Sequence, residues 1–181
     1  MSTQETENYD VVLLCEDALS QLDAQQVASL HDELRAEGTE VAYTVLLPVD
    51  DAAAKVEAAM SSLAAGEVMA SPALAMSDVD LEEVRRECRE RSEANLAESL
   101  TQLRAIVGSV SGRVISGQPI DALAEVVTEI DAREAIILTQ PHVVAEFFHL
   151  DWTSKARRKI GVPVLHLLER ETFAEQGESG V

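Results

Sequence analysis

The sequence has 181 residues, enough for one domain with a sizeable core but short for two. Hydrophobic residues make up 46% of it and aromatic residues only 3%, so we expect a core of aliphatic side chains. The 33 acidic and 14 basic residues give a formal net charge of −19, which argues against general binding to nucleic acid or to an anionic membrane surface.

The first half of the sequence begins with alternating strand and helix patterns. The apolar run Tyr9–Cys15 has the length and β-branched content of a strand that is covered on both faces. A helical pattern over residues 24–38 follows, and Val41–Val49 reads as a second strand. The residues expected on the inner face of this first helix are Val27, Leu30 and Leu34.

Residues 51–78 interrupt the alternation and form a long insertion or loop, which is typical of a lid, an interaction surface or a mobile segment. A long helix is predicted from about Asp80 to Val107, with Glu and Arg on its outer faces. Its expected aliphatic stripe consists of Leu81, Val84, Cys88, Leu96, Leu100, Leu103 and Val107.

The second half repeats the rhythm. Strands are expected over 112–117, 133–139 and 162–168, and helices over 118–131 and 143–161. This order predicts a single α/β domain over residues 9–170, with a doubly wound, Rossmann-like, five-stranded parallel sheet and helices on both faces. The polar ends, 1–8 and 171–181, are predicted to be disordered tails.

Location and chemistry follow mainly from what the sequence lacks. No apolar run approaches the roughly 20 residues of a membrane span, and the first ten residues have no pattern of a secretory signal, so we expect a cytoplasmic protein. The sequence has no G-x-S-x-G motif and no Cys or His at metal-ligand spacing. We therefore expect no catalytic residues and no metal site, and a protein that is not an enzyme.

Three stretches resemble the universal stress protein family. They are VVLLCED, where a strand ends in acidic residues; VISGQPIDALAEVVTEIDAREAIIL, with a G-x-P turn, a helix and a strand; and the closing GVPVLHL. The likeness spans roughly residues 9–170. It implies a nucleotide-binding fold, and it places Glu16 or Asp17 where the family has an aspartate that helps to hold the nucleotide. Acids at this position also cap turns and helices, and both interpretations stay open.

Family members that bind ATP carry Gly-x2-Gly-x9-Gly-(Ser/Thr) after the fourth strand, because glycines let backbone N–H groups approach the phosphates. Aligned from the fourth strand, the three glycine positions fall at Thr139, His142 and Trp152, and the hydroxyl position at Thr153. Aligned from Pro163 instead, the Gly-Ser pair falls at Leu150-Asp151. The resemblance therefore implies a divergent member that lacks the glycine-rich loop.

A short segment gathers half of the aromatic residues, including the single tryptophan, and a run of basic ones. It could be an anchor for a protein partner, since such residues dominate interface hot spots. Alternatively, the aromatic residues are the inner face of a helix, and the basic run complements the negative end of the helix dipole. The residues are Phe147, Phe148, Trp152, Lys155, Arg157, Arg158 and Lys159.

The last strand, 162–168, has no charge and would invite pairing as an exposed edge, so we expect a homodimer through it, as in many members of the resembled family. The favoured hypothesis is a non-enzymatic protein of the universal stress type, without a cofactor, that acts through dimerisation and contacts with an unknown protein partner. One alternative is a divergent ATP or AMP binder, in which Glu16, Asp17, Thr139 and Thr153 frame the ligand. Another is a small enzyme on the same scaffold.

Overall fold

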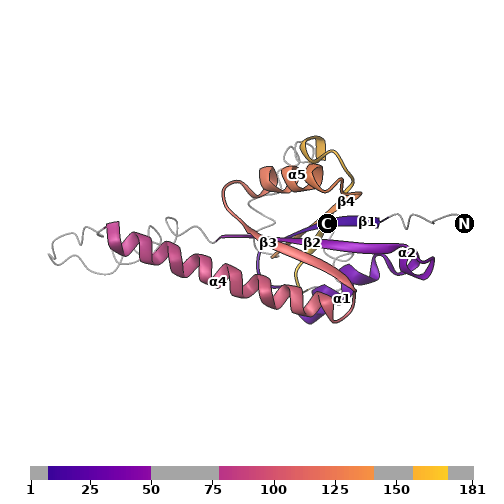
Figure 1. The fold of residues 1–181 in the computed structure, drawn as a ribbon, viewed down its shortest axis with the longest axis horizontal. Helices are drawn as coiled ribbons and strands as arrows, with labels where there is room; N and C mark the ends of the chain where they lie inside the picture. The colour runs from indigo at the N-terminus through magenta and orange to yellow at the C-terminus, as the bar shows by residue number, and fades with distance from the viewer. Residues whose placement is uncertain (1–7, 50–77, 141–156, 171–181) are drawn as a thin grey trace, which may run out of the picture.

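A computed structural model describes residues 8–49, 78–140 and 157–170, and these residues form one parallel sheet with helices on both faces (Figure 1). The strand order is β3-β2-β1-β4-β5, so β1 is central and β3 and β5 are the edges. The strands are β1 (Asn8–Cys15), β2 (Glu40–Pro48), β3 (Ser109–Ile115), β4 (Glu134–Thr139) and β5 (Val164–Leu168). The predicted fold class and its single sheet are confirmed.

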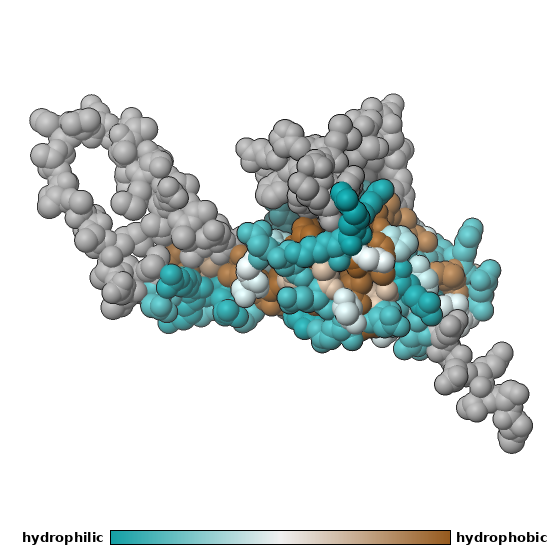
Figure 2. All heavy atoms as spheres, turned by 90° about the horizontal axis from the view of Figure 1, so that it is seen from above, coloured by the Kyte–Doolittle hydropathy of each residue, from teal (hydrophilic) through white to brown (hydrophobic). Residues whose placement is uncertain are grey.

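Two helical layers cover the sheet. In Figure 1, α1 (Gln21–Ser29), α2 (Asp32–Ala36) and α4 (Asp78–Arg104) lie on one face, and α5 (Pro119–Glu129) lies on the other. Residues 157–160 form a helical turn on the α5 side. Figure 2, seen from that side, shows hydrophilic residues over much of the described surface, as the net charge of −19 would lead one to expect.

The central strand β1 is buried and apolar at every position from Val11 to Cys15. Val11, Leu13 and Cys15 pack into the cluster beneath α1 and α4, whereas Val12 and Leu14 pack into the cluster beneath α5. Successive side chains of a strand point to opposite faces, so a strand covered on both faces needs an unbroken apolar run.

The predicted helix over 24–38 is wrong as a single element, because the chain forms α1 and α2 with a break at residues 30–31. The reason is His31, whose side chain is only 4% exposed and is bonded to side chains of the sheet. Leu30, expected on the inner face, is 36% exposed. The helix also starts earlier than predicted, because Ser20 and Asp23 form a capping box.

The long helix is confirmed, but its inner stripe is not only aliphatic. Ser92 and Ser99 are buried within it, and each donates a hydrogen bond to the carbonyl four residues earlier.

The third strand begins and ends earlier than the predicted 112–117, since its residues from Ser109 onward pair with β2. Of the predicted helix 143–161, only residues 157–160 lie in the described part, and they are helical.

The insertion 51–78, apart from its last residue, and the predicted tails, apart from Asn8, lie outside the described residues. Within the described ranges, no helix is long and apolar enough to cross a membrane.

Candidate functional site

A cavity of about 290 Å³ lies at the carboxyl ends of β1, β2 and β4. Its position is the point where the strand order reverses around β1, which is where doubly wound sheets bind their ligands. Its volume is at the lower end of the ~300–1,000 Å³ typical of small-molecule sites. The lining residues are Glu16, Asp17, Leu47, Pro48, Arg91, Ser92, Asn95 and Gln140.

The two carboxylates directly after β1 are held in place by interactions with other parts of the chain. Glu16 Oε2 accepts a hydrogen bond from the backbone N–H of Gln140 at 3.0 Å. Asp17 Oδ1 accepts one from Asn95 Nδ2 at 2.8 Å, and Asp17 Oδ2 lies 3.9 Å from Arg170 Nη2. These two carboxylates place negative charge on one wall of the cavity, and the basic side chain of Arg91 lines it as well.

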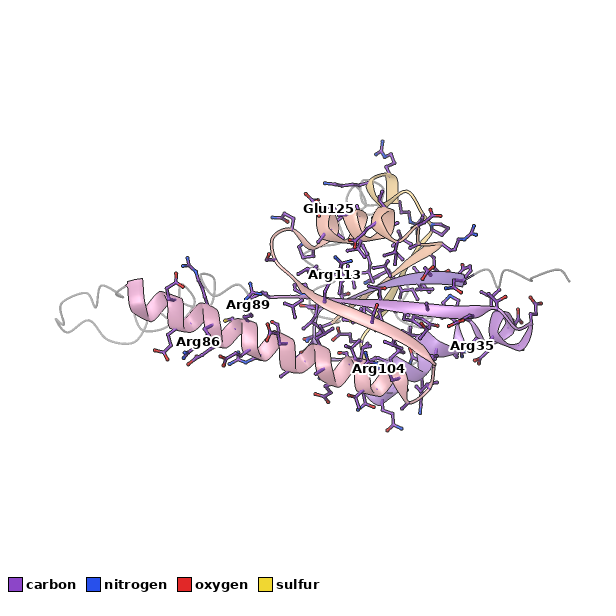
Figure 3. The ribbon with its side chains drawn as sticks, viewed as in Figure 1. Arg35, Arg86, Arg89, Arg104, Arg113 and Glu125 are labelled. Atoms are coloured by element: carbon purple, nitrogen blue, oxygen red, sulfur yellow. The ribbon has the colours of Figure 1, made fainter. Side chains whose placement is uncertain are left out.

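A polar stripe on α4 forms the opposite wall. Ser92 Oγ donates to the carbonyl of Pro48 at the end of β2, at 3.3 Å, and Ser99 Oγ accepts from the backbone N–H of Leu19 at 2.9 Å. Together with Asn95 these residues tie α4 to the chain that leaves β1 and β2. The earlier turns of α4, which carry Arg86 and Arg89, extend past the end of the sheet (Figure 3).

Sequence reasoning missed this stripe, because the long helix was interpreted by its aliphatic residues alone. The signal was nevertheless present, since Ser92, Asn95 and Ser99 are spaced by three and four residues and therefore share one face of a helix.

Two further acids lie behind the cavity. Asp23 is 2% exposed and Glu169 is 3% exposed. Glu169 Oε1 accepts a hydrogen bond from the backbone N–H of Asp17 at 3.3 Å, and Asp23 Oδ1 accepts one from that of Arg170 at 2.6 Å. Burial, together with the charges of Glu16, Asp23 and Asp17, raises the pKa of Glu169 to about 7, although the Asp17 N–H acts in the opposite direction.

The fold can be compared with that of known proteins. No protein-family model matches the sequence, and no curated protein has a detectably similar sequence. Among solved structures, the hypothetical protein MJ0577 is 14% identical, with a TM-score of 0.56 over 91% of this chain and 99% of that one. A universal stress protein from Archaeoglobus fulgidus is 14% identical, with a TM-score of 0.47 over 87% of this chain and 93% of that one.

A universal stress protein family member from Arabidopsis thaliana, solved with AMP bound, is 11% identical, with a TM-score of 0.49 over 90% of this chain and 92% of that one. The chain shares the α/β fold of MJ0577, and universal stress proteins are among the solved structures that it resembles. At these identities the likeness describes only how the helices and strands are arranged. Which ligand the chain can bind depends on its own side chains.

Within this fold, the predicted site residues separate. Glu16 and Asp17 do line the cavity. Thr139, at the end of β4, does not, because its hydroxyl lies 2.8 Å from His166 Nε2, and the neighbouring Gln140 takes the place on the cavity wall. The remaining predicted site residues lie outside the described part of the chain; these are His142, Phe147, Phe148, Trp152, Thr153 and Lys155.

The basic residues of the predicted interaction segment that are described lie away from the cavity. Arg157, Arg158 and Lys159 are exposed on the helical turn 157–160, and Lys159 Nζ pairs with Asp121 Oδ1 of α5 at 2.5 Å. A role for them in binding a partner stays a prediction.

A second buried polar cluster lies near the amino ends of β1 and β4, away from the cavity. His31 Nδ1 lies 2.8 Å from Tyr43 Oη, and His31 Nε2 lies 2.8 Å from Glu134 Oε1. Tyr9 Oη donates to Glu134 Oε2 at 3.1 Å. The order hydroxyl, imidazole, carboxylate is that of a catalytic triad, but Tyr43 is only 1% exposed, so the cluster joins α1 and α2 to the sheet.

Proposed function

We propose that this chain is a non-enzymatic binding protein that uses the universal stress protein fold to hold a small ligand other than ATP. The observation that carries the proposal is the cavity at the switch point of the sheet, with the fixed carboxylates of Glu16 and Asp17 on its wall. Such a wall favours ligands that donate hydrogen bonds, such as hydroxyl and amino groups, because a carboxylate only accepts.

The same wall disfavours a triphosphate. Asp23 adds negative charge behind Glu16 and Asp17, and Glu169 adds to it whenever its carboxyl group is ionised. Charges within a partly buried site interact strongly because water screens them little. The hydroxyl of Thr139, at the first glycine position implied by the resemblance, is engaged by His166.

The cavity also lacks the groups of the common catalytic arrangements. Of the lining residues in the described part of the chain, none is His or Cys. Within the described ranges, no group of three or more His, Cys, Asp and Glu residues could hold a metal ion. Carboxylates, an amide and a serine bonded to backbone carbonyls are suited to binding, which supports a non-enzymatic role.

A second candidate is a nucleoside or AMP site. Two acids after β1 at the switch point fit the ribose side of such a ligand, since carboxylates accept from sugar hydroxyls. AMP, which is bound in the Arabidopsis protein, is therefore a useful probe.

Thermal melting with 5 mM Mg-ATP, AMP or adenosine separates these functions. A ligand at 100 times its Kd stabilises by about 2.7 kcal/mol, which corresponds to roughly 5–10 °C for a domain of this size. We expect no such shift with Mg-ATP. A shift with AMP or adenosine that Asp17→Asn removes would establish the second candidate at this cavity.

The matched control is Glu125→Gln, which removes one negative charge from the outer surface of α5 (Figure 3). An Mg-ATP shift of 5 °C or more that survives in this control and is lost in Asp17→Asn would contradict the proposal. Mass spectrometry of small molecules that co-purify with the protein would identify the ligand directly.

We also propose that the protein dimerises through β5. Among the described strands this one is an edge that pairs with β4 alone, and Leu165 on it is 40% exposed. An uncharged edge is open to a second copy, and a two-fold axis would pair the two strands.

Leu165→Lys is expected to convert the dimer into a monomer in sedimentation experiments, because a charged side chain on an edge strand opposes its pairing with a second copy. Ile106→Lys is the matched control, since Ile106 is 41% exposed but lies beside β3 at the opposite edge. A wild-type protein that sediments as a monomer at all concentrations would rule out the dimer.

A further inference from the structure

We propose that Glu169 is a proton-operated switch for the cavity, in which one proton on its carboxyl group decides how firmly the segment from Glu16 to Leu19 is held. Its importance for ligand binding rests on the function proposed above, whereas the switch itself belongs to the protein without any ligand.

The geometry makes Glu169 the link between the sheet and the cavity wall. Its backbone N–H donates to the carbonyl of Thr139 at 2.9 Å, which fixes the residue at the carboxyl end of β4 and β5. Its side chain accepts from the backbone N–H of Asp17 at 3.3 Å. Asp17 carries this backbone N–H and also lines the cavity. A change at Glu169 can therefore reach the cavity wall through this one residue.

The charges that face Glu169 are almost all negative. Glu16 and Asp17 come from the chain after β1, and Asp23 comes from α1. The buried thiol of Cys15 on β1 is uncharged, because burial raises its pKa. The basic group beside them, Arg170, is 65% exposed in its side chain and lies 3.9 Å from Asp17. On α4, the uncharged Asn95 and Ser99 bond to Asp17 and to the backbone N–H of Leu19, and the basic Arg91 lines the same cavity.

An ionised Glu169 would therefore be a fourth carboxylate in a site that buries it to 97%, so its neutral form is favoured. The pKa of about 7 is the consequence, against an ordinary value of 4.5. We call the structure closed when Glu169 accepts the hydrogen bond from the Asp17 backbone and open when this bond is broken. Because the pKa of Glu169 is raised in the closed structure, the closed structure holds the proton more tightly than the open one. Its stability is therefore greatest at low pH and falls as pH rises from about 4.5 to 7.

The charge of a ligand should act on the same proton. A positively charged group in the cavity would favour the ionised form of Glu169, and a negatively charged group would favour the protonated form. Protonation of Glu169 therefore links how firmly the segment from Glu16 to Leu19 is held to the charge of the group bound in the cavity.

Hydrogen exchange of the Asp17 amide, in protein without ligand, tests the switch. With pKa values of about 7 when closed and 4.5 when open, the opening equilibrium should rise roughly 30-fold between pH 5.5 and 8.5, after correction for intrinsic exchange. Glu169→Gln keeps the acceptor oxygen but not the proton, so its opening equilibrium should change less than 3-fold. Glu125→Gln, on the outer face of α5, should behave as the wild type.

A wild-type opening equilibrium that is independent of pH would overturn the switch, as would a Glu169→Gln variant with the full pH dependence. If this variant does not fold, the carboxyl carbon of Glu169 can be titrated by NMR in the wild type. A midpoint near 7 supports the switch, and one near 4.5 overturns it. Neither measurement uses a ligand, so their failure leaves the proposed function standing, and a large shift with ATP would contradict that function without touching the switch.

Discussion

Replacing His31 with alanine is expected to lower the free energy of unfolding by on the order of 3 kcal/mol. The imidazole is 4% exposed and is bonded at both nitrogens, to Tyr43 and to Glu134. Its removal leaves a buried hydroxyl and a partly buried carboxylate without this partner, and each such loss costs about 1–3 kcal/mol in addition to the cavity that remains. Urea unfolding of the variant measures the loss.

A double-mutant cycle shows whether the cost arises from the cluster. Tyr43→Phe removes the hydroxyl that would otherwise be left without the imidazole, so the double variant should lose clearly less than the sum of the two single variants. Tyr9→Phe is the milder control, because it removes one hydrogen bond at the edge of the cluster and should cost about 1 kcal/mol. Additive losses, or a loss below 1 kcal/mol for His31→Ala, would contradict this account.

The cluster also predicts a direction with pH. Burial alone would raise the pKa of Glu134, but the hydrogen bond and charge of His31, with the Tyr9 hydroxyl, hold that pKa below its usual range. Since the pKa is lowered on folding, the stabilisation is present above about pH 4.5 and is lost as pH falls through the folded value. His31→Ala should reduce this acid-dependent loss.

Replacing Gly112 with alanine is expected to cost about 2 kcal/mol, and replacing it with valine more. Gly112 lies in β3 directly under α4, and a Cβ atom there would lie 2.8 Å from the carbonyl oxygen of Val45 and 2.9 Å from Leu96 Cδ1. The carbonyl belongs to the neighbouring strand β2, so the two strands would have to move apart locally, and Leu96 of α4 would have to give way as well. Overpacking of this kind costs typically 1–3 kcal/mol.

Gly108 is the matched control for this prediction. It precedes the same strand, its φ is not positive, and a Cβ atom there meets nothing within 4 Å. Gly108→Ala should leave the midpoint of thermal unfolding unchanged or raise it slightly, because it restricts the unfolded chain. If both substitutions had equal effects, close packing of α4 on β3 would not be the reason for the glycine.

Much of the fold could be predicted from the sequence, because the signals are local. The unbroken apolar run of β1 reflects cover on both faces, and the alternation of strands and helices implies the parallel sheet. The carboxylates of Glu16 and Asp17 could be placed at the cavity for the same reason, since residues that directly follow a central parallel strand must lie at its carboxyl edge.

The rest depends on residues that are far apart in the chain. The bond between Asn95 and Asp17 spans 78 residues, and the one between His31 and Glu134 spans 103. The residue pattern within one helix carries no information about a hydrogen-bond partner so far away in the sequence. The sequence by itself therefore determined the elements, the fold class and the two acids after β1. Only the tertiary structure decided that α1 and α2 separate at His31, that α4 walls the cavity, and that Glu169 lies buried behind Asp17, because each arrangement depends on hydrogen bonds between residues far apart in the chain.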